Sequence, residues 1–142
     1  MTQQYRVTTA VEKLLNSVIN TIVALIVSAP VLLFDLSVLQ LKLILIIVFF
    51  LENLEAILFH KYRLPGMWAM GTYWKEPYSI SQKLIHAVLY SASFSTLVFW
   101  VWVPGDLLLF NLLCVQLPCV LITGTTLHGL LAGNMIDVKP VD

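Results

Sequence analysis

The segment from Ser37 to Phe59 combines a long apolar run with two carboxyl groups, and it restricts the fold more strongly than any other part of the chain. At about 1.5 Å of rise per residue, about 20 apolar residues cross the hydrocarbon core of a bilayer. Glu52 and Glu55 lie in the second half of this run. Because a carboxylate at the centre of a membrane helix costs about 2.5 to 3.5 kcal/mol, we expect both to face protein or water. Their i, i+3 spacing places them on one face of the helix.

The composition excludes an ordinary soluble domain. Of the 142 residues, 59% are hydrophobic and 11% are charged, whereas about 25% of the residues of a typical soluble domain are charged. The sequence therefore predicts an all-α polytopic membrane protein. The formal net charge is zero, so nothing indicates a nucleic-acid partner. We find no internal repeat and no linker, and we expect residues 1–142 to form a single transmembrane domain.

Four segments are apolar and long enough to cross a bilayer. We expect helices over residues 13–34, 37–59, 80–103 and 107–131. Between the second and third helices, residues 60–79 mix basic and aromatic side chains, which is typical of a segment at the headgroup level. Cys114 and Cys119 lie five residues apart on the last helix and point in different directions, so we expect no disulfide between them.

The basic residues indicate the orientation in the membrane. Apart from Lys42, near the outer end of the second helix, Lys and Arg lie before the first helix or at its start, between the second and third helices or in the first turn of the third, and in the C-terminal tail. The turns after the first and third helices contain Asp35 and Asp106 and no Lys or Arg. By the positive-inside rule, both termini and the segment of residues 60–79 are cytoplasmic.

With this orientation, polar side chains from all four helices fall at one level in the cytoplasmic half of the membrane. The predicted cluster consists of Asn16, Asn20, Glu52, Glu55, His86, Thr123 and His128. Carboxyl and imidazole groups that are buried together are candidates for binding protons or cations. The alternative is that these side chains only lock helix packing, or that Glu55 reaches the headgroups. Both interpretations remain open at this point.

The sequence offers no pattern that is typical of an enzyme. It has no Ser, His and Asp arrangement, no glycine-rich phosphate loop and no paired His motif for a metal. His60, His86 and His128 are dispersed along the chain. We therefore expect a protein that is not an enzyme and that uses neither a cofactor nor a metal.

Three segments resemble the RDD family of small bacterial membrane proteins. Residues 55–74 are similar to the family's pattern of a helix that ends in Glu and is followed by a short glycine-containing segment. The matching residues in this segment are Pro65, Gly66 and Gly71. Residues 125–138 resemble the end of the family's last helix, with His128, Ala132 and Gly133 matching.

The third similar segment is the first helix, where Lys13, Asn16 and Asn20 have the spacing of the family's Arg, Ala and Asp. The Arg and the two Asp that give the family its name appear here as Lys13, Asn20 and Gly129. Glu52 and Glu55 then remain as the acids inside the predicted spans.

The resemblance implies a multi-pass protein of the bacterial cytoplasmic membrane. Some members of the family are associated with sodium/proton exchange, so it implies a cation or proton transporter as one function. Since 16 kDa and four helices leave limited room for a pathway, we instead expect an accessory subunit without enzymatic activity. Its expected partners are the lipid bilayer and either other membrane protein subunits or copies of itself.

Overall fold

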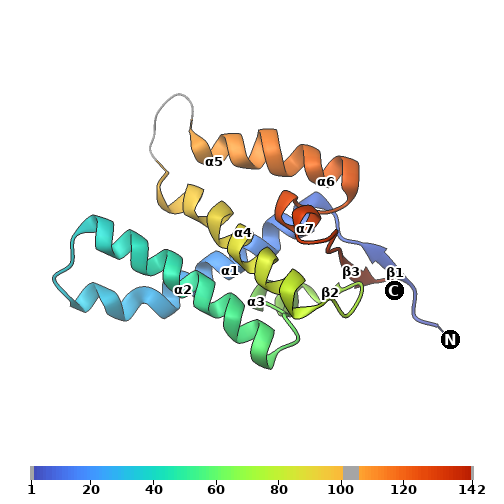
Figure 1. Cartoon of the computed structure of the whole chain (residues 1–142), viewed down its shortest axis with the longest axis horizontal. Coiled ribbons are helices and arrows are strands. Elements are labelled where there is room, and N and C mark those ends of the chain that lie inside the picture. Colours follow the sequence, from blue (N-terminus) through green and yellow to red (C-terminus); the bar gives the residue numbers. More distant parts are fainter. Residues whose placement is uncertain (1, 101–105, 142) are drawn as a thin grey trace.

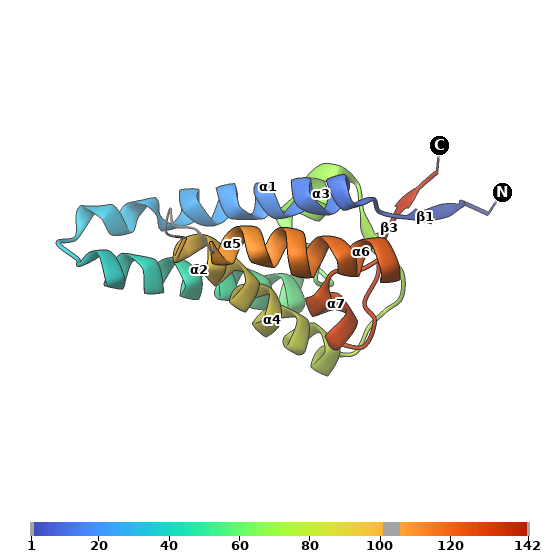
Figure 2. The ribbon, with the colours of Figure 1, turned by 90° about the horizontal axis from the view of Figure 1, so that it is seen from above.

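The computed structural model describes residues 2–100 and 106–141. It is mostly helical, which confirms the predicted all-α class. The principal helices are α1 (Ala10–Ser28), α2 (Val38–Phe59), α4 (Ile80–Val98) and a helical run made of α5 (Leu107–Leu109), the π-helical η2 (Phe110–Gln116) and α6 (Leu117–Thr123). They run lengthwise in alternating directions and form an elongated bundle (Figures 1 and 2).

The two ends of the bundle differ. One end carries the turn between α1 and α2, which includes the short 3₁₀ helix η1 (Ala29–Leu33). The opposite end carries α3 (Pro65–Met70), α7 (Leu127–Leu131), a small sheet and the two ends of the chain (Figure 2). We refer to it below as the sheet end.

The sheet joins segments that lie outside the four predicted helices. Its strands β1 (Tyr5–Val7), β3 (Asp137–Pro140) and β2 (Tyr73–Trp74) lie in that order and pair antiparallel. Arg6 lies opposite Lys139, and Tyr73 lies opposite Val138. Through β3, the N-terminal segment and the segment between α2 and α4 are fixed to the same end of the bundle.

Each of the three long helices begins with a capping box. The hydroxyls of Thr9, Ser37 and Ser79 accept a hydrogen bond from the backbone N–H three residues later. The side chain at that later position, a Glu or Gln, accepts the N–H of the cap residue in return. This reciprocal pair explains why α1 begins at Ala10, three residues before the predicted start.

The last predicted helix, 107–131, is not continuous. Gly124 adopts a left-handed conformation with φ of 78° and ends α6. Glycine adopts this conformation without steric cost. The chain then restarts as α7, whose first turn is capped by the Thr126 hydroxyl. The third predicted helix, 80–103, ends as α4 at Val98, and its predicted residues 101–103 lie outside the described residues.

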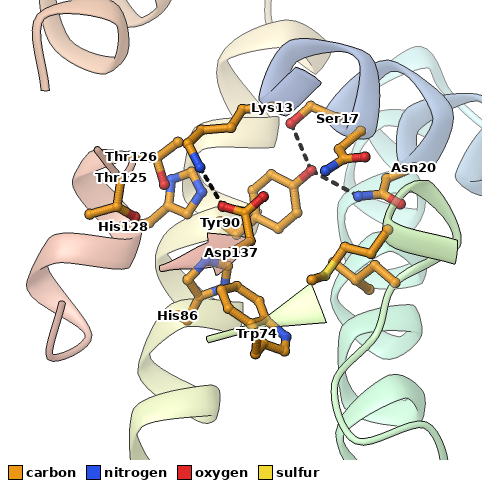
Figure 3. Close-up of a pocket in the computed structure, with 13 residues that line it drawn as sticks. Lys13, Ser17, Asn20, Trp74, His86, Tyr90, Thr125, Thr126, His128 and Asp137 are labelled. Carbon is orange, nitrogen blue, oxygen red and sulfur yellow. Dashed lines mark hydrogen bonds and ion pairs between the residues drawn. The ribbon is translucent and has the colours of Figure 1, made fainter. Parts of the chain in front are cut away.

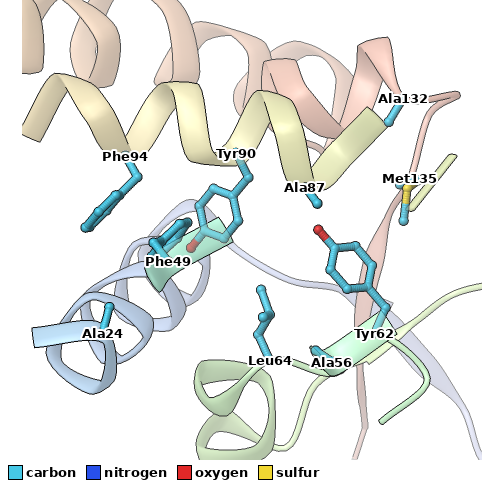
Figure 4. Close-up of a cluster of buried hydrophobic side chains, with 10 residues drawn as sticks. All are labelled: Ala24, Phe49, Ala56, Tyr62, Leu64, Ala87, Tyr90, Phe94, Ala132 and Met135. Atoms are coloured by element: carbon cyan, nitrogen blue, oxygen red, sulfur yellow. The ribbon is translucent and has the colours of Figure 1, made fainter. Parts of the chain in front are cut away.

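The core of the bundle is built from aromatic and small side chains (Figure 4). The rings of Phe49 and Phe94 stack with their centroids 4.0 Å apart, and Tyr90 lies edge-on to Phe49 at 5.0 Å. Ala24 is completely buried beside them, and its small side chain lets α1 approach these rings closely. These side chains fill the middle of the bundle.

The outer faces of the helices are apolar. Leu25, Ile47, Val88 and Leu113 are each more than half exposed. By length and composition, Ala10–Leu33 is the one helix of the described chain that is apolar enough to cross a membrane, and Leu107–Thr123 is a shorter apolar helix.

Candidate functional site

The candidate site is a polar cavity of about 60 Å³ near the sheet end of the bundle (Figure 3). Its walls come from α1, α3, α4 and α7, from β2 and β3, and from the segments that join them. A cavity needs about 10 to 15 Å³ of such space to admit one water molecule, so this cavity is large enough for water.

A buried ion pair forms one wall. The Lys13 ammonium donates to the Asp137 carboxylate and to the Thr8 hydroxyl. The Thr8 hydroxyl in turn donates to the other Asp137 oxygen at 2.7 Å. Lys13 is 8% exposed and Asp137 is 9% exposed. Because a buried charge is tolerated only when it is paired and hydrogen-bonded, these three residues stabilise one another.

The inward face of α1 supplies the next wall. Lys13, Asn16, Asn20 and Ala24 recur at three- and four-residue spacing and are the buried residues of α1. Asn20 accepts the backbone N–H of Gly66 at 2.7 Å and donates to the Tyr90 hydroxyl at 3.1 Å. This one side chain therefore holds α1, α3 and α4 together.

A second hydrogen-bonded chain supports His86. The fully buried Tyr62 donates its hydroxyl proton to Asn53 Oδ1 at 3.0 Å, and the Tyr62 hydroxyl oxygen lies 2.6 Å from His86 Nδ1. Because the hydroxyl has one proton, His86 Nδ1 must carry the hydrogen of the second bond. The Asn53 Nδ2 amide in turn donates to the Phe49 carbonyl at 2.9 Å. Burial raises the pKa of the Tyr62 hydroxyl well above its usual value, so Tyr62 stays a donor.

His128 completes the cavity. Its ring lies 4.8 Å from the rings of both Tyr90 and His86, measured between centroids. Burial first, and then the positive charge of Lys13, lower the pKa of His128 to about 3. The imidazole is therefore neutral at physiological pH.

Two buried atoms at this site have no hydrogen-bond partner in the described part of the chain. They are His128 Nδ1 and Asn16 Oδ1. Both residues line the cavity and are more than nine-tenths buried. Buried polar atoms are nearly always hydrogen-bonded, so these two atoms keep unused hydrogen-bonding capacity next to the cavity.

The structure brings together four of the predicted cluster residues and separates the others from them. Asn16, Asn20, His86 and His128 line the cavity. Glu52, Glu55 and Thr123 do not line it.

The residues outside the cavity have other surroundings. Glu55 is exposed and lies 2.8 Å from His60 Nε2, and Glu52 is half-buried. The Thr123 hydroxyl donates to the Cys119 carbonyl of its own helix at 2.7 Å. Cys119 and Cys114 are free thiols in the structure. The inward polar residue of α2 is Asn53, and the carboxylate of the cavity is Asp137 instead of either glutamate.

Sequence reasoning missed Asp137 because this residue lies in the C-terminal segment, after the last predicted helix. A signal for it was available, since a lysine on the inward face of an apolar helix requires an acid. The candidates were the acids outside the four predicted helices, including Asp137.

The glycines of the predicted signature segments have identifiable structural roles. A Cβ atom on Gly66 would lie 2.2 Å from the Asn16 carbonyl oxygen, so only glycine allows α3 to contact α1. Gly71 ends α3 with φ of 65°. A Cβ atom on Gly129 would lie 2.2 Å from the Thr125 hydroxyl oxygen and 2.8 Å from the Met135 carbonyl oxygen. An aspartate at position 129 therefore does not fit this structure.

The arrangement offers a neutral imidazole, an ion pair and several hydroxyl and amide groups around a small, partly open space. Within residues 2–100 and 106–141, no group of three or more His, Cys, Asp and Glu side chains is placed to hold a metal ion. Comparisons of the chain with protein-family models, with curated proteins and with solved structures find no match.

Proposed function

We propose that the chain is an integral membrane protein of RDD type, with four spans formed by α1 with η1, by α2, by α4 and by the run from α5 to α6. The observation that supports this is the inside-out distribution of side chains. The polar side chains of Asn20, Asn53 and His86 are buried, whereas large apolar side chains cover the outside. In water such a surface would promote aggregation. In a membrane it is the ordinary surface that contacts lipid.

The proposed location is the bacterial cytoplasmic membrane, with both termini and residues 60–79 on the cytoplasmic side. The sheet fixes these three segments to one end of the bundle (Figure 2). Lys61 and Arg63 lie between α2 and α3 and Lys75 follows β2, all at the sheet end, while Asp35 lies in the turn between η1 and α2 at the other end. The positive-inside rule then assigns the more basic end of the bundle to the cytoplasmic side.

Within this placement, the function that we propose is that of an accessory subunit without enzymatic activity. It would pack its apolar faces against a larger membrane complex or against copies of itself. The stacked rings of Phe49 and Phe94, together with Ala24, fill the bundle between the cavity and the opposite end. A single copy therefore has little room for a pathway through its own centre.

The mass of the complex extracted from membranes tests this proposal. In mild detergent, we expect the protein to migrate with a fixed partner or as an oligomer with a defined number of copies, far above 16 kDa plus its detergent. Cross-linking in intact membranes before extraction is the control for dissociation by detergent. A monomer in both measurements would contradict the subunit proposal.

The second candidate function is a cation or proton transporter, and the buried Lys13–Asp137 pair is the observation that favours it. Ionisable groups inside a membrane protein mark ion pathways in many transporters. Vesicles that contain the purified protein and a pH-sensitive dye would report flux. Transport that is lost in Asp137→Asn, or in Glu52→Gln with Glu55→Gln, would favour this function, and the absence of flux in the unaltered protein would exclude it.

A further inference from the structure

A second cavity, on the outside of the sheet end, is lined mainly by basic residues. It has a volume of about 310 Å³ and is open on one side. Four of its lining residues are basic and one is acidic, namely Lys61, Arg63, Lys75, Lys83 and Glu76. Its volume lies at the lower end of the range for small-molecule sites, which is about 300 to 1,000 Å³. The excess of positive charge selects an anion.

The three lysines of this cavity have no side-chain ion pair or hydrogen bond within residues 2–100 and 106–141. Elsewhere in the same range, Lys13 and Lys139 both have a carboxylate partner. Like charges that converge on one space repel one another unless an anion lies between them. The charges of Lys61, Lys75 and Lys83 are therefore available to a ligand.

The basic cavity is held by rigid neighbours. Lys61 and Tyr62 both have positive φ, 52° and 60°, which side-chain-bearing residues rarely adopt. The buried Tyr62 hydroxyl and the bond from its backbone N–H to the Ala56 carbonyl at 2.7 Å fix this turn. The backbone at Lys61 therefore has a fixed conformation at the end of α2.

Arg63 is fixed as well. Its guanidinium lies over the rings of Trp68 and Tyr73, 4.0 Å and 3.9 Å from their centroids. Its Nε donates to the Thr72 carbonyl at 2.9 Å. A guanidinium that is stacked and bonded in this way contributes a charge without a large loss of side-chain freedom when an anion binds.

The surroundings of the cavity match a lipid more closely than a free anion. Leu58 and Phe59, at the end of α2, are 73% and 74% exposed, and Ile80, at the start of α4, is 68% exposed. They are the neighbours in sequence of Lys61 and Lys83. Exposed apolar side chains therefore lie within three residues of two of the lysines that line the basic cavity. Trp68 and Tyr73, both exposed, are typical residues of the headgroup level.

We propose that the basic cavity binds the phosphate group of an anionic phospholipid, with the acyl chains along the outer surfaces of α2 and α4. This inference rests on the proposed membrane placement. Basic cavities at the cytoplasmic ends of membrane helices are suited to anionic headgroups, and each Lys or Arg near an anionic surface is worth about 1 kcal/mol, or about fivefold in affinity.

The test is a titration of the purified full-length protein in a nonionic detergent, followed by native mass spectrometry. Four probes are compared, namely short-chain phosphatidylglycerol, short-chain phosphatidylcholine, glycerol phosphate and inorganic phosphate. We expect phosphatidylglycerol to bind at least tenfold more tightly than any of the other three. Equal affinity for the two lipids would overturn the proposal. Equal affinity for phosphatidylglycerol and glycerol phosphate would overturn the assignment to a lipid.

A pair of variants locates the binding. Lys61→Gln with Lys83→Gln should weaken phosphatidylglycerol binding by about thirtyfold. The matched control, Lys42→Gln with Lys139→Gln, removes the same charge outside the cavity and should change binding less than twofold. Lys75 is exposed, and Lys75→Gln should weaken binding by about fivefold even if the double variant does not fold. Equal binding by Lys75→Gln and the control protein would overturn the proposal.

Extraction at alkaline pH separates this proposal from the membrane proposal. A protein that leaves the membrane fraction in carbonate without detergent would contradict the four spans, whatever it binds. A protein that resists extraction but does not distinguish the two lipids would contradict the lipid site alone.

Discussion

Lys13 places a positive charge inside the bundle, and Asp137 compensates it from a strand 124 residues away in sequence. Removing one partner of a buried ion pair costs about 3 to 5 kcal/mol because the remaining charge is left unpaired. We therefore expect Asp137→Ala to lower the free energy of unfolding by about 3 kcal/mol. The measurement is unfolding of the detergent-solubilised protein by a denaturing detergent.

The double variant Lys13→Met with Asp137→Ala is the control for this prediction. It removes both charges, so its loss should be smaller than the sum of the two single losses by about 1 to 3 kcal/mol. Losses that simply add would show that the two side chains do not depend on each other.

His128 makes the stability depend on pH. Its pKa is about 3 in the folded chain and about 6.5 in an unfolded one. Below pH 6.5 the unfolded state therefore binds a proton that the folded state does not bind, and stability falls. Between pH 6.5 and pH 5 the expected loss from this residue is about 2 kcal/mol. His128→Gln should show a shallower decline than the unaltered protein over the same range, measured by thermal unfolding, and an identical decline would contradict the burial of a neutral imidazole.

A site residue could be predicted from the sequence where its signal lies within one helix. It could not be predicted where it depends on contacts between helices. Asn16 and Asn20 were predicted because a polar stripe on a single helix is visible in its own spacing. Glu52 and Glu55 also share one face of their helix, but spacing alone does not tell which face contacts the neighbouring helices. In the structure Asn53, the residue after Glu52, is the polar residue of α2 that faces the interior of the bundle.

The contact between α1 and α3 depends on one glycine. A methyl group at position 66 would collide with the backbone of Asn16, and a backbone cannot move aside as a flexible side chain can. We expect Gly66→Ala to separate the two helices, to weaken the bond from the Gly66 N–H to Asn20, and to lower the free energy of unfolding by about 3 kcal/mol.

Gly71→Ala is the matched comparison on the same helix. A Cβ atom there has nothing within 4 Å, so its cost comes only from the left-handed backbone and should be about 1 to 2 kcal/mol. Thermal unfolding in detergent checks both variants, and equal losses would contradict a close contact at Gly66.

Helix boundaries were predictable where local chemistry sets them. The Ser or Thr followed three residues later by Glu or Gln marks the starts of α1, α2 and α4, and Gly124 marks the end of α6. The three strands have two to four residues each, which is too short for an alternating pattern to be read. Their pairing joins the first and last segments of the chain, so it cannot be predicted from a local sequence pattern.

At the scale of the whole molecule, the sheet fixes the topology relative to the ends of the bundle. The two termini and residues 60–79 must lie on the same side of any membrane that the bundle crosses. Labelling of single cysteines with a membrane-impermeant maleimide in intact cells tests this arrangement, in a background in which Cys114 and Cys119 are replaced by Ala. We expect Asp35→Cys to be labelled from outside, and Gln4→Cys and Lys75→Cys to be labelled only after the membrane is opened.

The physical basis of this prediction is the cost of moving charge and backbone through lipid. Turning the molecule over would place Lys61, Arg63, Lys75 and Lys83 on the outer side, against the bias that sets orientation during insertion. Losing one span would place a terminus on the opposite side from residues 60–79 and would break β3 away from β1 or β2. Labelling of Lys75→Cys after permeabilisation is the control for its reactivity. External labelling at Asp35→Cys and also at Gln4→Cys would contradict the four-span arrangement, because the antiparallel pairing of β1, β3 and β2 cannot form across a bilayer.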